Sequence, residues 1–277
     1  MRGLSDRMQD AFASRLRGRE SLVGAWCTVG HPVVAEVLAA EPVDFVVLDG
    51  EHSENDLGDL ADCVRAVDAA NHRAREREGA DATQTATVVR ASGPDRAEIK
   101  RLLDLGPDGV LVPQVESLAD AEAAAQASQY PPEGVRGVAG GRAADYGRTL
   151  GDYYERANDD VATFVQVETT GALDDADAIA DLDGVDALFV GPADLSARLG
   201  AFAEFDDAAF ADAVADVVAA AHGADEPIAV GTLATSTANA PERKHDWGMD
   251  YVVGGVDVAH LREGLGGYLD ALDGGAD

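Results

Sequence analysis

Carboxylates follow two apolar segments of the chain, and their chemistry indicates what kind of site the fold could build. Leu188–Val190 is a short apolar run, and Asp194 follows it after a Gly-Pro break; Phe164–Val167 is a second run and ends in Glu168. Catalytic groups of α/β barrels lie just past the C-terminal ends of buried strands. Two such carboxylates that converge would give an oxygen-rich site for a hard divalent cation. The alternative is that both acids are solvated loop residues or helix caps, which this acidic chain has in number.

Other polar side chains follow two earlier apolar runs. Phe45–Leu48 is followed by the sequence DGEH, which includes Glu51 and His52, and Thr87–Val89 is followed by Arg90. A histidine, an arginine and two carboxylates around one metal ion would form an acid–base site. Taken singly, His52 could be a helix cap or packing residue and Arg90 an ion-pair partner. Their joint placement at strand ends favours catalysis.

Alternating strand and helix patterns would bring these groups together. We predict strands at Val23–Val29, Phe45–Leu48, Thr87–Arg90, Gly109–Val115, Thr163–Glu168, Ala187–Val190, Ile228–Leu233 and Asp250–Gly255. Eight strands separated by helices in 277 residues favour a single-domain α/β fold, the (β/α)8 TIM barrel, with its core at about residues 23–269. No strand is followed by GxGxxG, which disfavours a dinucleotide-binding sheet. In a barrel all strand ends share one rim.

Three further segments have a distinct character. Residues 1–20 are charged and amphipathic and lack the apolar core of a signal peptide, so they predict a capping helix of a cytoplasmic protein. The polar stretch His72–Thr85 is expected to be a surface insertion, and Glu133–Arg148, rich in Gly and Arg, a functional loop. Ala172–Leu182 predicts one helix. No apolar run is long enough to cross a bilayer, so no membrane partner is expected.

The formal net charge of −31 restricts the possible partners. It argues against nucleic-acid binding, because phosphate contacts need lysine and arginine. Acid spread over all the predicted helices, with almost no lysine, resembles proteins of extreme halophiles, in which high salt screens the self-repulsion. The alternative is an ordinary acidic protein.

The two lysines restrict the mechanism. A Schiff-base aldolase needs a lysine on a barrel strand, whereas Lys100 falls within a predicted helix and Lys244 in a polar helix. Carbanion chemistry in this barrel would therefore need a metal ion as its electron sink.

Several short motifs occur in a characteristic order along the chain. They are Val47–His52 with Asn55–Leu57, Val88–Arg90, Leu103–Gly106, Tyr130–Pro132 with Gly134, Arg136 and Gly137, Gln166–Glu168, and Gly191–Ser196. Together they resemble the HpcH/HpaI aldolases, class II pyruvate aldolases related to 4-hydroxy-2-oxoheptanedioate aldolase. The resemblance covers about residues 23–269, and its ordered combination is specific although each motif alone is weak.

The resemblance implies a metal-dependent site. Glu168 and Asp194 would bind Mg2+, Mn2+ or Co2+, and the ion would chelate the carboxylate and keto oxygens of pyruvate. Backbone N–H groups of Ala193 and Asp194 would hold the carboxylate, with Gln166 and Leu233 also contacting the substrate.

It also implies the acid–base groups. Arg90 would stabilise the enolate oxygen, and His52, oriented by Asp104, would act as the base through a metal-bound water. Gly137–Arg148 is shorter than the usual loop of the family, which lies near the aldehyde side of the pocket.

The predicted function is therefore reversible cleavage of a 4-hydroxy-2-oxo acid, of the 2,4-dihydroxyhept-2-enedioate type, to pyruvate and an aldehyde. One alternative is a lyase acting on CoA thioesters such as malyl-CoA or citramalyl-CoA, which predicts a basic patch that the scarcity of lysine disfavours. Another is a catalytically silent barrel that binds an organic acid. The resemblance also implies a homo-oligomer, a hexamer in which terminal helices exchange between neighbours.

Overall fold

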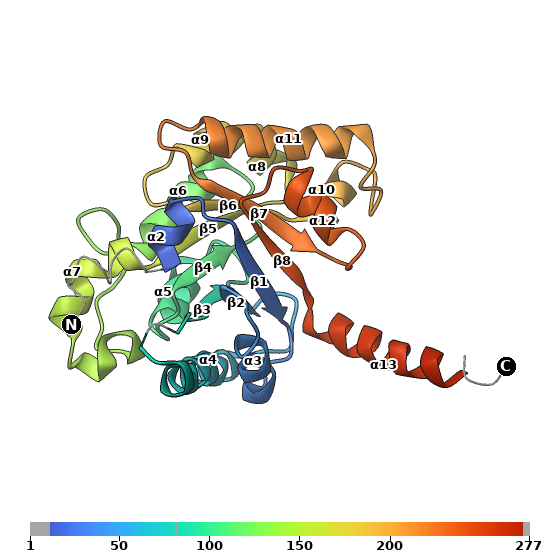
Figure 1. Cartoon of the computed structure of the whole chain (residues 1–277). Helices are drawn as coiled ribbons and strands as arrows, with labels where there is room; N and C mark the ends of the chain where they lie inside the picture. Colours follow the sequence, from blue (N-terminus) through green and yellow to red (C-terminus); the bar gives the residue numbers. More distant parts are fainter. Residues whose placement is uncertain (1–11, 81, 274–277) are drawn as a thin grey trace.

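Eight parallel strands follow one another in chain order around a closed barrel (Figure 1). The computed structural model describes residues 12–80 and 82–273. The strands are β1 Leu22–Cys27, β2 Phe45–Asp49, β3 Ala86–Arg90, β4 Gly109–Val112, β5 Ala162–Val167, β6 Ala187–Val190, β7 Ala229–Ala234 and β8 Tyr251–Val256. β8 pairs with β1 and closes the barrel. The predicted TIM barrel is confirmed; β4 ends earlier than predicted, immediately before Pro113.

Helices surround the barrel and connect its strands (Figure 1). They are α2 Phe12–Arg17, α3 Pro32–Ala39, α4 Leu57–Glu78, α5 Arg96–Leu103, α6 Leu118–Ser128, the 3-10 segment η1 Arg142–Gly147, α7 Leu150–Asp160, α8 Thr170–Asp174, α9 Ala176–Ala180, α10 Pro192–Arg198, α11 Ala208–Gly223, α12 Ala240–His245 and α13 Asp257–Asp273. Several begin at side-chain caps of the expected type; for example, Asp95 accepts from the backbone N–H of Glu98 at the start of α5. No helix in the described part of the chain is long and apolar enough to span a membrane.

Two apolar cores hold the barrel together. One lies between the strands and the surrounding helices, and the other fills the barrel interior. The interior core includes Phe45, Phe164 and Tyr251, whose side chains are at most 2% exposed. Strands whose two faces are both covered read as continuous apolar runs, which is why they were recognisable from the sequence.

Helix α2 covers the N-terminal ends of the strands, here called the closed end of the barrel. Its Phe12 ring lies 5.5 Å from that of Phe45 and 6.2 Å from that of Phe164, measured between centroids. Ala13 and Leu16 are buried in the same core. The predicted capping helix is thus confirmed for α2, and the rest of that prediction, residues 1–11, lies outside the described residues.

Four aspartates repeat around the closed end. Each immediately precedes an even-numbered strand and accepts a hydrogen bond from the second residue of the preceding strand: Asp44 from Val23 at 2.8 Å, Asp108 from Thr87 at 2.8 Å, Asp186 from Thr163 at 2.7 Å and Asp250 from Val230 at 3.0 Å. Three of them also form ion pairs with arginines in or just after α2: Arg15–Asp44 at 2.7 Å, Arg17–Asp186 at 2.6 Å and Arg19–Asp250 at 3.2 Å. These contacts attach the capping helix to three sides of the barrel.

Some connections differ from the prediction. His72–Glu78 is not an insertion but the last part of α4, and the chain returns to β3 through hydrogen bonds between Asn71 and Thr85. The helix predicted at Ala172–Leu182 is two short ones, α8 and α9. Helix α7 was not predicted, because its sequence carries few apolar residues.

Candidate active site

The polar strand ends meet at the C-terminal rim of the barrel, here called the mouth. Arg90, the last residue of β3, donates from Nε to Asp49 Oδ1 at 3.0 Å and from Nη2 to Asp49 Oδ2 at 2.6 Å. Its Nη1 lies 2.6 Å from Glu51 Oε2. The guanidinium also lies 4.7 Å from the centroid of the Trp26 ring, and Trp26 donates to Asp49 at 3.1 Å. Arg90 is therefore an ion-pair partner, as the alternative interpretation proposed.

Asp49 and Glu51 do not occupy all the N–H groups of the Arg90 guanidinium. Arginine carries five N–H groups. Two of them donate to Asp49, and Nη1 forms an ion pair with Glu51. The remaining N–H groups make no other hydrogen bond among the described residues, which leaves donors for a ligand. Burial raises the pKa of Asp49, but the hydrogen bonds and charge of Arg90 outweigh that effect and hold it below its usual value. Asp49 thus fixes a charged, oriented donor at the mouth.

Glu168 is buried at the end of β5, with 1% of its surface exposed. The backbone N–H of Gln114 donates to its Oε1 at 2.8 Å, and the side-chain amide of Gln166 donates to its Oε2. Burial is the main cause that raises the pKa of Glu168; the charges of Glu51 and Asp194 add to the rise, while the two hydrogen bonds oppose it. A buried carboxylate with acidic neighbours is suited to a cation.

Asp194 and Ala193 are exposed in the first turn of α10. That helix has no side-chain cap, so the N–H groups of its first turn are open to a ligand. Gly191, which precedes it, packs tightly against the acid: a Cβ there would lie 2.8 Å from Glu168 Oε2 and 3.1 Å from Gln166 Nε2. Only glycine lets this turn approach Glu168 so closely.

His52 lies at the edge of the mouth. Its side chain is 68% exposed, and Nε2 is 3.7 Å from Glu51 Oε1. Its backbone N–H donates to Asp49 Oδ1 at 3.2 Å. The turn that carries it is further held by Asn55, whose amide donates to the backbone carbonyls of Asp49 and Thr28. His52 is accessible to a substrate and has a carboxylate neighbour.

Asp104 does not meet His52 within one chain. It is the C-terminal cap of α5, at the closed end of the barrel, and its side chain lies 3.5 Å from Arg136 Nη2. Helices of a barrel run opposite to its strands, so their C-termini lie at the far end from the strand-end site. The loop Gly137–Arg148 follows a helix too and contacts Asp104 through the backbone of Ala143. Neither lies beside the mouth of its own chain.

Leu233 lies in β7 near the mouth and is partly buried against the barrel interior. Its carbonyl accepts from Nη1 of Arg243, a buried residue of α12. The Arg243 guanidinium is 4.6 Å from the Phe205 ring and 4.9 Å from the Trp247 ring. Burial lowers the pKa of Arg243 to about 10.

The residues at the mouth fit a divalent cation. Within residues 12–80 and 82–273 no group of three or more His, Cys, Asp and Glu side chains could hold a metal ion. Mg2+, however, is bound in many enzymes by one or two carboxylates, with substrate and water completing its shell. Glu168 and Asp194 supply two carboxylates, and beside them Gln166 Oε1 is buried with no hydrogen-bond partner among the described residues. An oxygen acceptor buried without a partner next to a carboxylate suits a cation or a donor from a ligand.

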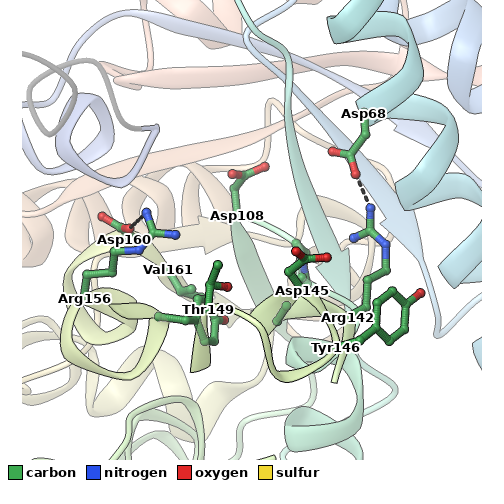
Figure 2. Close-up of a pocket in the computed structure, with 13 residues that line it drawn as sticks. Asp68, Asp108, Arg142, Asp145, Tyr146, Thr149, Arg156, Asp160 and Val161 are labelled. Atoms are coloured by element: carbon green, nitrogen blue, oxygen red, sulfur yellow. Dashed lines mark hydrogen bonds and ion pairs between the residues drawn. The ribbon is translucent and has the colours of Figure 1, made fainter. Parts of the chain in front are cut away.

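Figure 2 shows a separate pocket of about 500 Å³. Asp108, Asp160 and Val161 line it just before β4 and β5. Its lining includes the ion pairs Arg142–Asp68 and Arg156–Asp160 (Figure 2). The pocket is thus remote from the strand-end carboxylates and belongs to the closed end.

Comparison with known proteins identifies the family. The sequence model of the HpcH/HpaI aldolase/citrate lyase family matches residues 22–264. The chain belongs to the HpcH/HpaI aldolase/citrate lyase family. A 5-keto-4-deoxy-D-glucarate aldolase of Escherichia coli (strain K12 / DH10B) is 34% identical over 260 residues, 93% of this chain and 94% of that protein. The family model is named for aldolases and citrate lyases and the curated relatives are named aldolases, so this HpcH/HpaI protein is a carbon–carbon lyase.

Solved structures agree with this assignment. An HpcH/HpaI aldolase/citrate lyase family protein from Burkholderia cenocepacia J2315 has a TM-score of 0.85 at 36% identity, over 94% of this chain and 98% of that one. A citrate lyase beta subunit from M. tuberculosis, complexed with oxaloacetate and magnesium, has a TM-score of 0.53 at 18% identity, over 88% and 95% of the two chains. At 18% identity, the similarity to the citrate lyase beta subunit shows the fold alone.

The sequence prediction missed part of this HpcH/HpaI site. Glu51 was noted but given no role, although it bridges Arg90 and Gln114. Gln114 was not considered at all, because the run GVLVPQV reads as one strand and hides a polar residue inside it. Pro113 could have revealed it: proline rarely continues a central strand, so the strand ends before Pro113 and Gln114 lies outside it.

Proposed function

We propose that this chain reversibly cleaves a 4-hydroxy-2-oxo acid to pyruvate and an aldehyde, with Mg2+, Mn2+ or Co2+ held by Glu168 and Asp194. The observation that carries the proposal is the meeting of buried Glu168 and exposed Asp194 with Arg90, whose guanidinium has N–H groups to spare, at one rim. The E. coli relative is named for 5-keto-4-deoxy-D-glucarate, which makes that acid the first substrate to test.

Substrate binding uses groups already oriented at the mouth. The backbone N–H groups of Ala193 and Asp194 hold the carboxylate of the 2-oxo acid, because the first turn of a helix presents unpaired donors to an anion. Gln166, fixed against Glu168, and Leu233 complete the contacts to the pyruvate part.

Bond cleavage then needs a base and a site for negative charge. His52 takes the proton of the C4 hydroxyl, the C3–C4 bond breaks to release the aldehyde, and the electron pair moves toward the keto oxygen. Return of a proton from His52 to C3 of the enolate then gives pyruvate and restores the base. The free N–H groups of Arg90 stabilise the charge on that oxygen. When bound, a divalent ion supplies Lewis-acid polarisation of the keto group, the role that a lysine plays in Schiff-base aldolases.

We also propose that the active species is a homo-oligomer. Helix α13 projects from the barrel after β8 (Figure 1), and large apolar side chains, most of them three or four residues apart, lie exposed along it. They are Val258, Leu261, Leu265, Tyr268, Leu269 and Leu272. On α3, Val33 and Val37 are also exposed, at 59% and 58%. Such stripes are typical of helix–helix contacts between chains.

Asp104 lies at the closed end of its own barrel, so in an oligomer it could contact only the His52 of a neighbouring chain. The hexamer, a role for Asp104 and the cytoplasmic location stay predictions.

The test is retro-aldol turnover of 5-keto-4-deoxy-D-glucarate, and the reverse reaction of pyruvate with a panel of aldehydes, each with Mg2+ or Mn2+. We expect Glu168→Gln and Asp194→Asn to abolish turnover and Mn2+ binding while circular dichroism stays unchanged. EDTA should inhibit reversibly. The matched control is Asp212→Asn, which removes one exposed carboxylate from α11. Full activity in excess EDTA would refute the metal assignment.

A further inference from the structure

Gln114 occupies the turn after β4, where its backbone takes an unusual conformation. Its φ is +56°, a left-handed conformation that residues other than glycine rarely adopt. Two hydrogen bonds hold this turn: the Gln114 N–H donates to Glu168 at 2.8 Å, and Thr169 donates to the carbonyl of Val115 at 2.7 Å. Strained backbone held in this way is concentrated at functional sites.

The same residue also contacts the other half of the site through its side chain. Gln114 Nε2 donates to Glu51 Oε1 at 3.1 Å. The second oxygen of Glu51 lies 2.6 Å from Nη1 of Arg90. Gln114 therefore lies between two carboxylates of like charge, Glu51 and Glu168, and gives each a hydrogen bond. It joins the groups of β2 and β3 to the carboxylate of β5.

We propose that Gln114 is a positioning residue of the lyase site, whose side-chain amide keeps Glu51 turned toward Arg90 while its backbone N–H holds Glu168. The expected change in kcat rests on the proposed function, whereas the positioning of Glu51 and Arg90 by Gln114 does not. Without the amide, Glu51 Oε1 loses its hydrogen bond from Gln114, and the exposed His52 Nε2, 3.7 Å away, is too far to replace it. Glu51 would then move, and the guanidinium of Arg90 would lose the contact that orients Nη1.

The test is Gln114→Met, which keeps the length of the side chain and the backbone N–H but removes the amide. Arg90 stacks on Trp26, so Trp26 fluorescence reports on the guanidinium; a Trp247→Phe background leaves Trp26 as the sole tryptophan. We expect an altered Trp26 emission spectrum, a 10- to 100-fold fall in kcat, a smaller change in KM, and Mn2+ affinity within about threefold. The Mn2+ affinity is measured by calorimetry on the metal-free protein.

The matched control is Gln126→Met, which removes the same type of bond, from Gln126 Nε2 to Glu122 at 3.2 Å, on the exposed face of α6. It should change none of these measurements. Unchanged Trp26 emission together with kcat within twofold of the parent would overturn the proposal, as would equal effects of the two variants. If the parent enzyme has no lyase activity, the proposed function fails, and the Trp26 spectrum alone still decides whether Gln114 positions Arg90.

Discussion

Replacing Arg90 with lysine separates the ion-pair role that the structure shows from the catalytic role that we propose for this residue. The guanidinium makes three contacts, two to Asp49 and one to Glu51. A lysine ammonium lacks the planar fork and can keep one of them. Loss of two charge-assisted bonds at about 1.5 kcal/mol each lowers the free energy of unfolding by about 3 kcal/mol. For a chain of this length the melting temperature should fall by about 6 °C.

The fall in kcat caused by Arg90→Lys should be much larger than the loss of folding stability can explain. Where circular dichroism shows the variant folded at 25 °C, a purely structural residue would leave kcat unchanged. If Arg90 stabilises the charge on the keto oxygen, kcat should fall by about 100- to 1000-fold. The assays are thermal unfolding by circular dichroism and retro-aldol turnover with saturating Mn2+.

The control for Arg90→Lys is Arg17→Lys, which weakens an arginine–aspartate pair at the closed end, 2.6 Å from Nε to Asp186 Oδ1. It should lower the melting temperature without lowering kcat. A destabilised Arg90→Lys enzyme with kcat within threefold of wild type would refute a catalytic role and leave Arg90 as an ion-pair partner only.

Three more outcomes are expected. Gly191→Ala should displace Glu168, because the added Cβ would lie 2.8 Å from Oε2, and Mn2+ affinity measured by calorimetry should fall at least tenfold. The control Gly93→Ala places its Cβ with no heavy atom of a non-adjacent residue within 4 Å and should leave the affinity unchanged. Equal Mn2+ affinities of the two variants would contradict this geometry. The folded pKa of Asp49 lies below its usual value, so its carboxylate stabilises the fold above about pH 4 and that contribution disappears as the pH falls through the lower, folded value. The stability gap between wild type and Asp49→Asn should therefore close in acid; a gap that widens would be inconsistent. With a net charge of −31, the proposed oligomer should dissociate at about 10 mM KCl, where the Debye length is about 30 Å, and persist at about 1 M, where it is about 3 Å. Light scattering that shows a stable oligomer at low salt would rule out the halophilic interpretation.

Strand ends were predictable from the sequence because local chemistry marks them. Arg90 and Glu168 each follow an uninterrupted apolar run, and a charge cannot continue a strand buried on both faces without a partner. Since the ends of parallel strands meet at one rim, the convergence of Arg90, Glu168 and Asp194 followed from topology. Those predictions needed no knowledge of side-chain contacts.

The rest of the site depends on tertiary contacts that sequence patterns do not encode. Asp104 ends a helix, and helix ends lie opposite to strand ends, so a role beside His52 conflicts with the barrel's own geometry within one chain. The position of Gln114 depends on a left-handed backbone stabilised by Glu168, a residue 54 positions away. The pairing of Glu51 with both Gln114 and Arg90 likewise arises only once three strands are in register.

The carboxylates of the closed end and Glu168 at the mouth are compensated in different ways. At the closed end, Arg15 and Arg17 and their neighbour Arg19 neutralise three of the four repeated aspartates. At the mouth, Glu168 is paired with amide donors that carry no charge. Glu168 therefore has no cationic partner among the residues that hydrogen-bond to it, and the charge of Asp194 lies close by. A local negative potential of this kind attracts divalent cations. Salt that screens repulsion across the rest of the surface also screens this attraction. If the halophilic interpretation and the proposed metal site both hold, the ionic strength that best supports the folded chain is higher than the one at which it binds a metal ion fastest.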